Sequence, residues 1–118
     1  MNGIANSVQL IGNIGVSLVP GCTPNGKKFI RFAIATNEIF KDASGTKREE
    51  TQWHNLVAWG KLADIVVKFL CKGKRVAVEG KLIHRSYTDK EGVKRYITEV
   101  VVRELLFLDM KKVENETV

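Results

Sequence analysis

The chain has 118 residues, of which 44% are hydrophobic and 27% are charged. A length near the commonest single-domain size predicts one domain with a buried core, and this composition excludes wholesale disorder. No apolar run approaches the roughly 18 residues of a membrane-spanning helix, and residues 1–6 lack the features of a signal or transit peptide. We therefore expect a cytoplasmic protein that does not enter a membrane.

The charge balance is basic and uneven. The chain carries 19 Lys and Arg against 13 Asp and Glu, a formal net charge of +6. The excess lies centrally, because residues 61–95 contain 10 basic and 4 acidic groups. Such a surface suits a polyanionic partner. Cys22 and Cys71 form no C-x-x-C pair, so we expect two reduced thiols and neither a zinc site nor a disulfide.

The first half of the chain predicts strands separated by turns. Residues 6–12 alternate apolar and polar side chains and predict a strand, whereas residues 15–28 are rich in turn formers and predict a loop. Residues 29–36 place aromatic and β-branched side chains at period two and predict a second strand. Residues 40–59 predict a long hairpin that leads into a third strand.

One helix and two strands are predicted in the second half. Residues 61–70 place apolar side chains at helical spacing, and Gly73 supplies a stop. Residues 75–87 and 94–108 predict two strands joined through a glycine-containing turn. Gly12, Gly15 and Gly80 predict bulges, bends or close backbone approaches within strands.

The order of elements predicts an all-β fold. Five strands with one helix between the third and fourth are typical of the oligonucleotide/oligosaccharide-binding (OB) fold, a partly closed Greek-key barrel. An SH3-like barrel and an α+β domain remain alternatives. We expect this domain to span residues 1–110, with residues 111–118 as a short C-terminal extension.

Two tryptophans share a face of the third predicted strand. Period two places Trp53 and Trp59 on one side, and His54, Leu56 and Ala58 on the other. The tryptophans could fill a core, or they could form a stacking platform for nucleic-acid bases, with Leu56 and Ala58 supplying the core instead.

Further aromatic and basic residues lie near the predicted hairpins. Phe40 and Tyr87 are in or beside polar hairpins, where aromatic residues are not obvious core members. Interleaved cations could follow a phosphate backbone, although each alone could be an ordinary solvated charge. The candidate DNA-binding cations are Lys41, Arg48, Lys61, Lys72, Lys74 and Arg85.

Catalytic and metal-binding patterns are missing from the sequence. No P-loop, G-x-G-x-x-G, H-E-x-x-H or G-x-S-x-G motif occurs, and His54 and His84 have no recognisable ligand spacing with Glu49 or Glu50. We expect no enzyme, no metal and no cofactor. His54 is better placed for a core or a subunit contact.

Several ordered motifs resemble the bacterial single-stranded DNA-binding proteins. They are N-S-V-Q-L-I-G-N-I-G, F-A-I-A-T-N-E, T-Q-W-H-N-L-V-A-W-G-K-L-A, K-G-K-R-V-A-V-E-G-K-L and T-E-V-V-V, which together extend over most of residues 6–110. The resemblance implies an OB fold whose aromatic residues stack on single-stranded DNA during replication, recombination and repair. It also implies a homotetramer, a dimer of dimers, associated with the nucleoid.

The resemblance assigns roles to individual residues. Trp53 matches a motif tryptophan, Phe40 and Tyr87 stand where many members have Trp, and Trp59 stands where many have Phe. Each exchange keeps a flat aromatic ring. The resemblance implies that His54 supports subunit association and that subunits join through their first strands, where Val8 and Leu10 lie.

One departure concerns protein partners. Typical members continue into a flexible linker and an acidic tip ending in Pro-Phe, which docks replication and repair proteins, whereas this chain ends at Val118 without such a tip. Recruitment of replication and repair proteins is therefore left open. Three alternative functions also remain open: a primosome accessory protein of the same fold, a metal-dependent nuclease on an OB barrel, and an RNA-binding protein.

Overall fold

The computed structural model describes residues 2–15, 19–69 and 73–108. In chain order its elements are η1 (Asn2–Asn6), β1 (Val8–Ile14), β2 (Val19–Cys22), β3 (Lys28–Lys41), β4 (Lys47–Trp59), α1 (Lys61–Phe69), β5 (Arg75–Thr88) and β6 (Lys94–Phe107). The predicted extension at residues 111–118 and the second cysteine, Cys71, lie outside the described residues. Within the described ranges, no helix is long and apolar enough to span a membrane.

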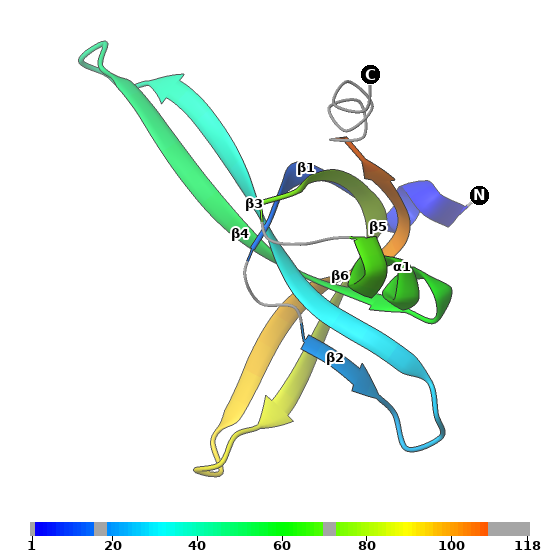
Figure 1. The fold of residues 1–118 in the computed structure, drawn as a ribbon. Helices are drawn as coiled ribbons and strands as arrows, with labels where there is room; N and C mark the ends of the chain where they lie inside the picture. Colours follow the sequence, from blue (N-terminus) through cyan, green and yellow to red (C-terminus); the bar gives the residue numbers. More distant parts are fainter. Residues whose placement is uncertain (1, 16–18, 70–72, 109–118) are drawn as a thin grey trace, which may run out of the picture.

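The strands close into a barrel (Figure 1). They pair in the order β1-β5-β6-β4-β3-β2, and β1 also pairs with β3 at Asn13 and Ile14. Five strands therefore form a closed ring, in which only the β4–β6 pair is parallel. This all-β barrel with one helix confirms the predicted OB-type fold.

The predicted loop over residues 15–28 is wrong where β2 forms. Val19–Cys22 pairs antiparallel with β3, from Val19 opposite Arg31 to Cys22 opposite Lys28. Pro20 and Gly21 favour a turn when read locally, but a proline is tolerated on an edge strand because its missing N–H can face away from the ladder. With β2 counted, the helix lies between the fourth and fifth strands, not the third and fourth.

Alternate residues of the strands fill the barrel. Ile34 and Leu56 are fully buried, and Val66 of α1 packs into the same core. Periodicity therefore predicted the core face of the strands. It predicted the buried face of the helix only in part, because Val66 is buried as expected, whereas Phe69 is 54% exposed and the small Ala63 is buried. The buried core residues are Ile14, Ile30, Phe32, Ile34, Leu56, Ala58, Ala63, Val66, Val76, Val78, Val100 and Val102.

Two glycines permit close contacts between strands. A Cβ atom on Gly80 would lie 2.1 Å from the carbonyl oxygen of Val101, and one on Gly12 would lie 2.2 Å from that of Ala35. The β5–β6 register shifts at Glu79/Gly80, which confirms the bend predicted at Gly80. Both positions require glycine because a side chain would push the paired strands apart.

Two hairpins extend from the barrel as arms (Figure 1). We call residues 37–51 the first arm and residues 84–98 the second arm. Their tips share the sequence D-x-x-G-x-K-R, at residues 42–48 and 89–95. At each tip the aspartate Oδ1 accepts two backbone N–H groups, from Ser44 and Thr46 in the first arm and from Glu91 and Val93 in the second. β3 and β4 therefore run further into the first arm than the predicted strands, because local turn chemistry closes that hairpin at its tip. The bounds of β5 and β6 lie close to the predicted ones.

Candidate nucleic-acid interface

Strand register brings the outward-pointing residues of four neighbouring strands onto one surface, which we call the outer face. Trp59 is paired with Phe29 across β3–β4, and Tyr87 with Arg95 across β5–β6. Within this surface the alternating residues are Phe29, Arg31, Ala33 and Ala35 of β3, Trp53, Asn55, Val57 and Trp59 of β4, Ile97, Glu99 and Val101 of β6, and Lys81, Ile83, Arg85 and Tyr87 of β5. Both tryptophans thus share one face, as the sequence predicted.

Trp53 presents its ring at the surface. It is 61% exposed, and a Cβ atom on Gly15 would come within 2.7 Å of its Cζ3 atom. The indole therefore rests against the backbone of Gly15 while much of its surface faces solvent. Leu56 and Ala58 occupy the core from the opposite side of the strand. This geometry favours the interpretation of Trp53 as part of a stacking platform over its interpretation as a core residue.

Trp59 belongs to a small aromatic cluster at the end of β4. Its ring centroid lies 5.2 Å from that of Phe29 with the planes tilted by 53°, and Lys27 Nζ lies 5.1 Å from the Trp59 centroid. Trp59 is half-buried. Phe29 supports one side of the indole, and Lys27 adds a positive charge beside it.

Tyr87 lies on the second arm. It is 47% exposed, and the guanidinium carbon of Arg85 lies 6.0 Å from its ring centroid. An exposed ring beside a cation can stack on a base while the cation attracts the adjoining phosphate.

A buried carboxylate ties the outer face together. Glu99 is 1% exposed and accepts hydrogen bonds from Arg85, through Nε at 2.9 Å and Nη2 at 3.1 Å, and from Arg31 Nε at 3.0 Å. The Arg85 hydrogen bond, aided by that of Arg31, holds the pKa of Glu99 below its ordinary value although burial opposes this. The same bond raises the pKa of Arg85. The three side chains together retain one positive charge.

The other predicted residues of the first hairpin lie near its tip. Phe40 is 44% exposed and pairs with Arg48, on the register face opposite that of Trp53. Arg48 Nε donates to Asp42 Oδ2 at 2.8 Å, and this bond is the main cause that lowers the pKa of Asp42 to about 2. The charge of Arg48 is therefore partly neutralised, whereas Lys41 is exposed.

Among the described residues, two of the predicted lysines lie at or after the helix. Lys61 is exposed at the first position of α1, and Lys74 is half-buried just before β5. Lys72 lies outside the described residues. Lys61 and Lys74 come from a different part of the barrel than the arms, so the described cations of the predicted set do not form one local cluster.

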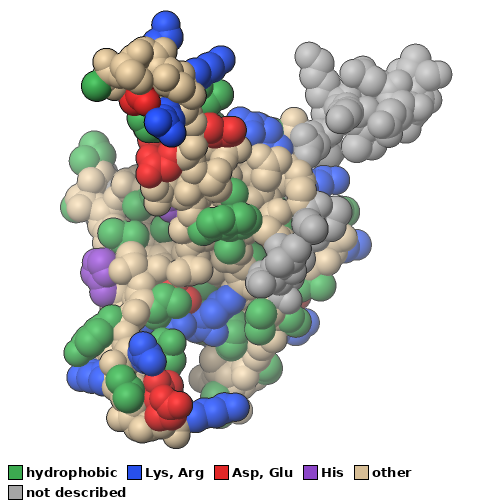
Figure 2. All heavy atoms as spheres, turned by 90° about the vertical axis from the view of Figure 1, so that its left-hand side faces the viewer, with side chains coloured by type: hydrophobic (Ala, Val, Ile, Leu, Met, Phe, Trp, Pro, Cys, Tyr) green, Lys and Arg blue, Asp and Glu red, His purple; other side chains and the backbone are tan. Residues whose placement is uncertain are grey.

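Basic side chains at the tips are mixed with acidic ones. Figure 2 shows Lys and Arg gathered at both arm tips, each group beside Asp and Glu side chains. Each tip carries an arginine–aspartate pair, Arg48–Asp42 in the first arm and Arg95–Asp89 in the second. The positive charge of the arms is therefore smaller than a count of their cations implies.

The predicted subunit-contact residues have partners within the chain. Val8 and Leu10 are half-buried and pack against the core. His54 is half-buried, with Nε2 2.9 Å from Thr36 Oγ1, on the register face opposite Trp53 as predicted.

Sequence reasoning missed three residues of the outer face: Phe29, Arg31 and Glu99. Phe29 and Arg31 occupy the non-core positions of a strand whose core face was recognised. Glu99 interrupts the apolar run that ends in V-V-V, and a charged residue in such a run signals a buried partner. Within the described ranges, no group of three or more His, Cys, Asp or Glu side chains could hold a metal.

Comparison with protein families gives one match over most of the chain. The model of the single-strand binding protein family matches residues 5–108. Single-stranded DNA-binding protein 1 of Chlorobaculum tepidum is 46% identical over 107 residues, which cover 90% of this chain and 66% of that protein. The Xylella fastidiosa protein of the same name is 42% identical over 112 residues, which cover 94% of this chain and 82% of that protein.

Solved structures share the fold. The structure of the Plasmodium falciparum SSB complex with ssDNA is similar, with a TM-score of 0.78 and 32% identity, covering 88% of this chain and 95% of that one. A deletion mutant of the single-stranded DNA binding protein from Thermus aquaticus gives a TM-score of 0.76 and 29% identity, covering 90% of this chain and 51% of that one.

Proposed function

We infer the function from one premise: the chain belongs to the single-strand binding protein family. We propose that it binds single-stranded DNA without strong sequence preference and protects and organises the strand during replication, recombination and repair. The observation that carries the proposal is the outer face, where exposed Trp53 and Tyr87, half-buried Phe29 and Trp59, and two arginines share one surface. As a DNA coat protein it would act at the nucleoid, in the cytoplasm.

Binding would combine stacking with neutralisation of phosphates. Every base has a π-face, so aromatic stacking is tolerant of sequence and contributes about 1–3 kcal/mol per base. Trp53, Trp59 and Tyr87 would supply rings on the outer face, with Phe40 contributing from the first arm. The cations proposed to contact phosphates are Lys41, Arg48, Lys61, Lys72, Lys74 and Arg85.

The proposed activity is binding without catalysis. The relatives named above are described as DNA-binding proteins. A nuclease would need acidic groups and a metal ion converging on one place. Incubation with labelled single strands and Mg²⁺ or Ca²⁺ is expected to leave them intact, and turnover would contradict pure binding.

We further propose a homotetramer built as a dimer of dimers. Residues 8–12 of β1 pair with β5 on one side, and no described strand pairs with their other side. This free edge, together with His54, would join subunits through their first strands. Val8 and Leu10, which lie on this strand and are half-buried against the core, would belong to the same subunit contact.

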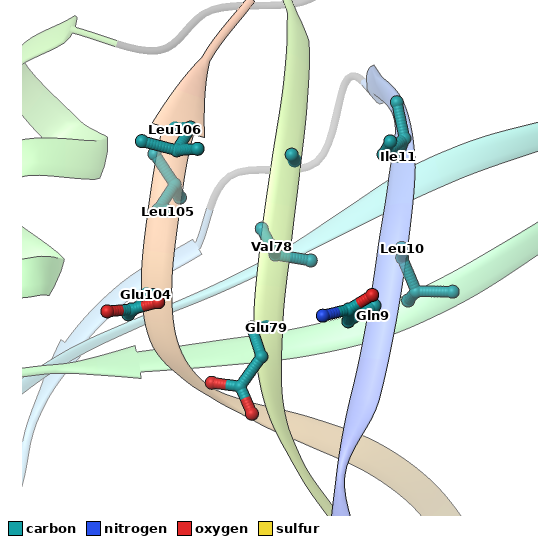
Figure 3. Close-up of a pocket in the computed structure, with 9 residues that line it drawn as sticks. Gln9, Leu10, Ile11, Val78, Glu79, Glu104, Leu105 and Leu106 are labelled. Atoms are coloured by element: carbon teal, nitrogen blue, oxygen red, sulfur yellow. The ribbon is translucent and has the colours of Figure 1, made fainter.

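An apolar hollow beside β1 supports the same assembly (Figure 3). Its volume is about 470 Å³, and it is lined on the outer side of β1, β5 and β6 by residues that include Gln9, Ile11, Glu79 and Leu106. Ile11 and Leu106 are 52% and 65% exposed. Burial of such side chains against a second copy would stabilise the assembly.

One titration tests the binding proposal. Tryptophan fluorescence is followed while oligomers of dT of increasing length are added at low and high salt, after light scattering has determined the mass. We expect quenching that saturates at a defined length and a slope of log K against log salt of about −0.7 per phosphate neutralised. No quenching, or a flat salt response, would contradict the proposal. Competition with a matched RNA strand distinguishes DNA from RNA as the preferred ligand.

A further inference from the structure

A continuous series of contacts crosses the outer face between two of the proposed stacking residues. At one end Phe29 packs on Trp59, and the guanidinium carbon of Arg31 lies 4.7 Å from the Phe29 ring centroid. In the middle Arg31 and Arg85 both bind Glu99, and at the other end Arg85 lies beside Tyr87. We call this series the outer-face strip: Trp59, Phe29, Arg31, Glu99, Arg85 and Tyr87.

We propose that Arg31 is a further DNA-binding residue, and that Glu99 is a positioning residue that holds Arg31 and Arg85 as a pair of phosphate contacts between Trp59 and Tyr87. The inference rests on the proposed function. It assigns a role to Arg31, which was not among the candidate cations, and to Glu99, which belongs to the T-E-V-V-V motif but had been given no role.

The hydrogen bonds of Arg31 leave donors for a ligand. Arg31 donates to Glu99 through Nε, and its two terminal nitrogens donate no hydrogen bond within residues 2–15, 19–69 and 73–108. Its side chain is 37% exposed, and that of Arg85 is 34% exposed. A guanidinium fixed through Nε presents its remaining N–H groups in a planar fork, which matches the oxygens of a phosphate.

A small hollow lies beside these donors. Its volume is about 120 Å³, and its lining includes Val19, Arg31, Asn55, Ile97 and Glu99. The hollow lies between β2 and β6, so the edge strand that the sequence did not predict forms one of its walls. A phosphate or sugar entering there would meet Arg31 directly.

The burial of Glu99 explains how a negative charge can lie in a surface that binds DNA. Glu99 is 1% exposed and is covered by the two guanidinium groups. An anion approaching from solvent therefore meets the arginines before the carboxylate. Removing Glu99 adds one positive charge to the surface, but it also releases both arginines from their fixed orientation. If only the net charge of the surface matters, DNA binding should become tighter after that change. If the orientation of the two arginines matters, binding should become weaker.

The first experiment compares Arg31→Gln with Lys28→Gln in titrations with dT oligomers at several salt concentrations. Both variants remove one positive charge from β3. Lys28 lies on the other register face, where Nζ is 3.6 Å from Asp64 Oδ1. We expect Arg31→Gln to weaken binding and to reduce the magnitude of the salt slope by about 0.7, the value for one phosphate contact on a single strand. Lys28→Gln should leave the slope unchanged. An unchanged slope in Arg31→Gln, or an equal loss in both variants, would overturn the assignment.

The second experiment tests whether Glu99 acts by positioning Arg31, by comparing the effect of Glu99→Gln in the presence and absence of Arg31. Glu99→Gln should weaken dT binding about tenfold, the loss of about one charge-assisted hydrogen bond. In the Arg31→Gln background the same change should weaken binding by a smaller factor, because one of the two positioned arginines is already absent. Tighter binding by Glu99→Gln, or an equal factor in both backgrounds, would overturn the positioning role. If circular dichroism shows Glu99→Gln to be unfolded, Glu99→Asp replaces it. Asp keeps the charge but is one methylene shorter, so we expect weaker dT binding, and unchanged binding would overturn the positioning role.

These outcomes are separable from those of the proposed function. If the unmodified protein does not bind dT oligomers, the proposed function fails. If it binds and the Arg31 and Glu99 variants bind equally well with the same salt slope, only the role of the outer-face strip fails.

Discussion

The arm tips and the outer-face strip both pair arginine with a carboxylate, but the partners come from different distances along the chain. At the tips, Arg48 binds Asp42 and Arg95 binds Asp89, each across six positions of sequence. In the strip, Glu99 binds Arg85 across 14 positions and Arg31 across 68. The tip pairs close turns and are solvated, whereas Glu99 is buried and connects three strands of the barrel. The same pair of functional groups thus supports local structure in one region and tertiary structure in the other.

The largest expected difference between the two regions is in stability. Glu99→Ala leaves two guanidinium groups without their shared acceptor, and breaking a buried pair in this way costs about 3–5 kcal/mol. Since Arg31 and Arg85 are about one-third exposed and can be rehydrated, we expect a loss near the lower end of that range. Urea denaturation at fixed protein concentration measures it. Asp42→Ala at the first tip is the matched variant, and equal losses in the two would refute the contrast.

Substitution of each tryptophan by alanine should affect DNA binding and protein stability to different extents. Trp53→Ala and Trp59→Ala are each expected to weaken single-strand binding by about 1–3 kcal/mol. Trp53 is 61% exposed, so its loss should leave the unfolding midpoint nearly unchanged, whereas half-buried Trp59 also packs on Phe29. Fluorescence anisotropy of a labelled dT oligomer and thermal denaturation measure the two effects. Unfolding of the Trp53→Ala variant would show that this indole is a core residue after all.

Alanine substitution of the glycine at each arm tip should reduce the stability of the protein by a similar amount. Gly45 and Gly92 have φ angles of 85° and 82°, and no atom would lie within 4 Å of an added Cβ. Gly45→Ala and Gly92→Ala should each destabilise the protein by about 1–2 kcal/mol, the cost of a left-handed backbone with a side chain. Comparison of the two denaturation curves checks this. Clearly different losses would mean that the shared D-x-x-G-x-K-R sequence does not make equivalent turns.

The smallest expected effect is the pH dependence of the first tip. The pKa of Asp42 is lowered from 3.8 to about 2, mainly by Arg48 and then by Ser44. A lowered pKa means that the folded state favours the charged form, so its contribution to stability is present above pH 3.8 and disappears as the pH falls to about 2. Denaturation of the unmodified protein and of Arg48→Gln between neutral and acidic pH should give curves that converge at about pH 2. A constant difference across this range would contradict the assignment.

Local patterns predicted much of the fold. The apolar spacing of residues 61–70 predicted α1, and alternation in residues 29–36 predicted the core face of β3, because both signals lie within one element. β2 was missed since its four residues include Pro20 and Gly21, which favour a turn when read locally, although it pairs with the nearby start of β3, at residues 28–31. A short edge strand carries little signal of its own.

The candidate site, like the fold, could be predicted from the sequence only in part. Alternation placed Trp53 and Trp59 on one face, and it placed His54 on the other. It did not indicate that Phe29 would support Trp59, or that Arg31 and Arg85 would share one carboxylate, since these contacts cross strands whose pairing the sequence does not specify.

By itself, the sequence determined the class of fold, the kinds of residue available for binding, and the turns at the two arm tips. These features depend on neighbours within a few positions, where backbone propensity and hydrogen bonding act directly. Only the tertiary structure decided that the tryptophan face of β4 lies outside the core and which cations reach the aromatic rings. That outcome depends on barrel closure and strand register, through which Arg31 reaches the buried carboxylate of Glu99, 68 positions further along the chain.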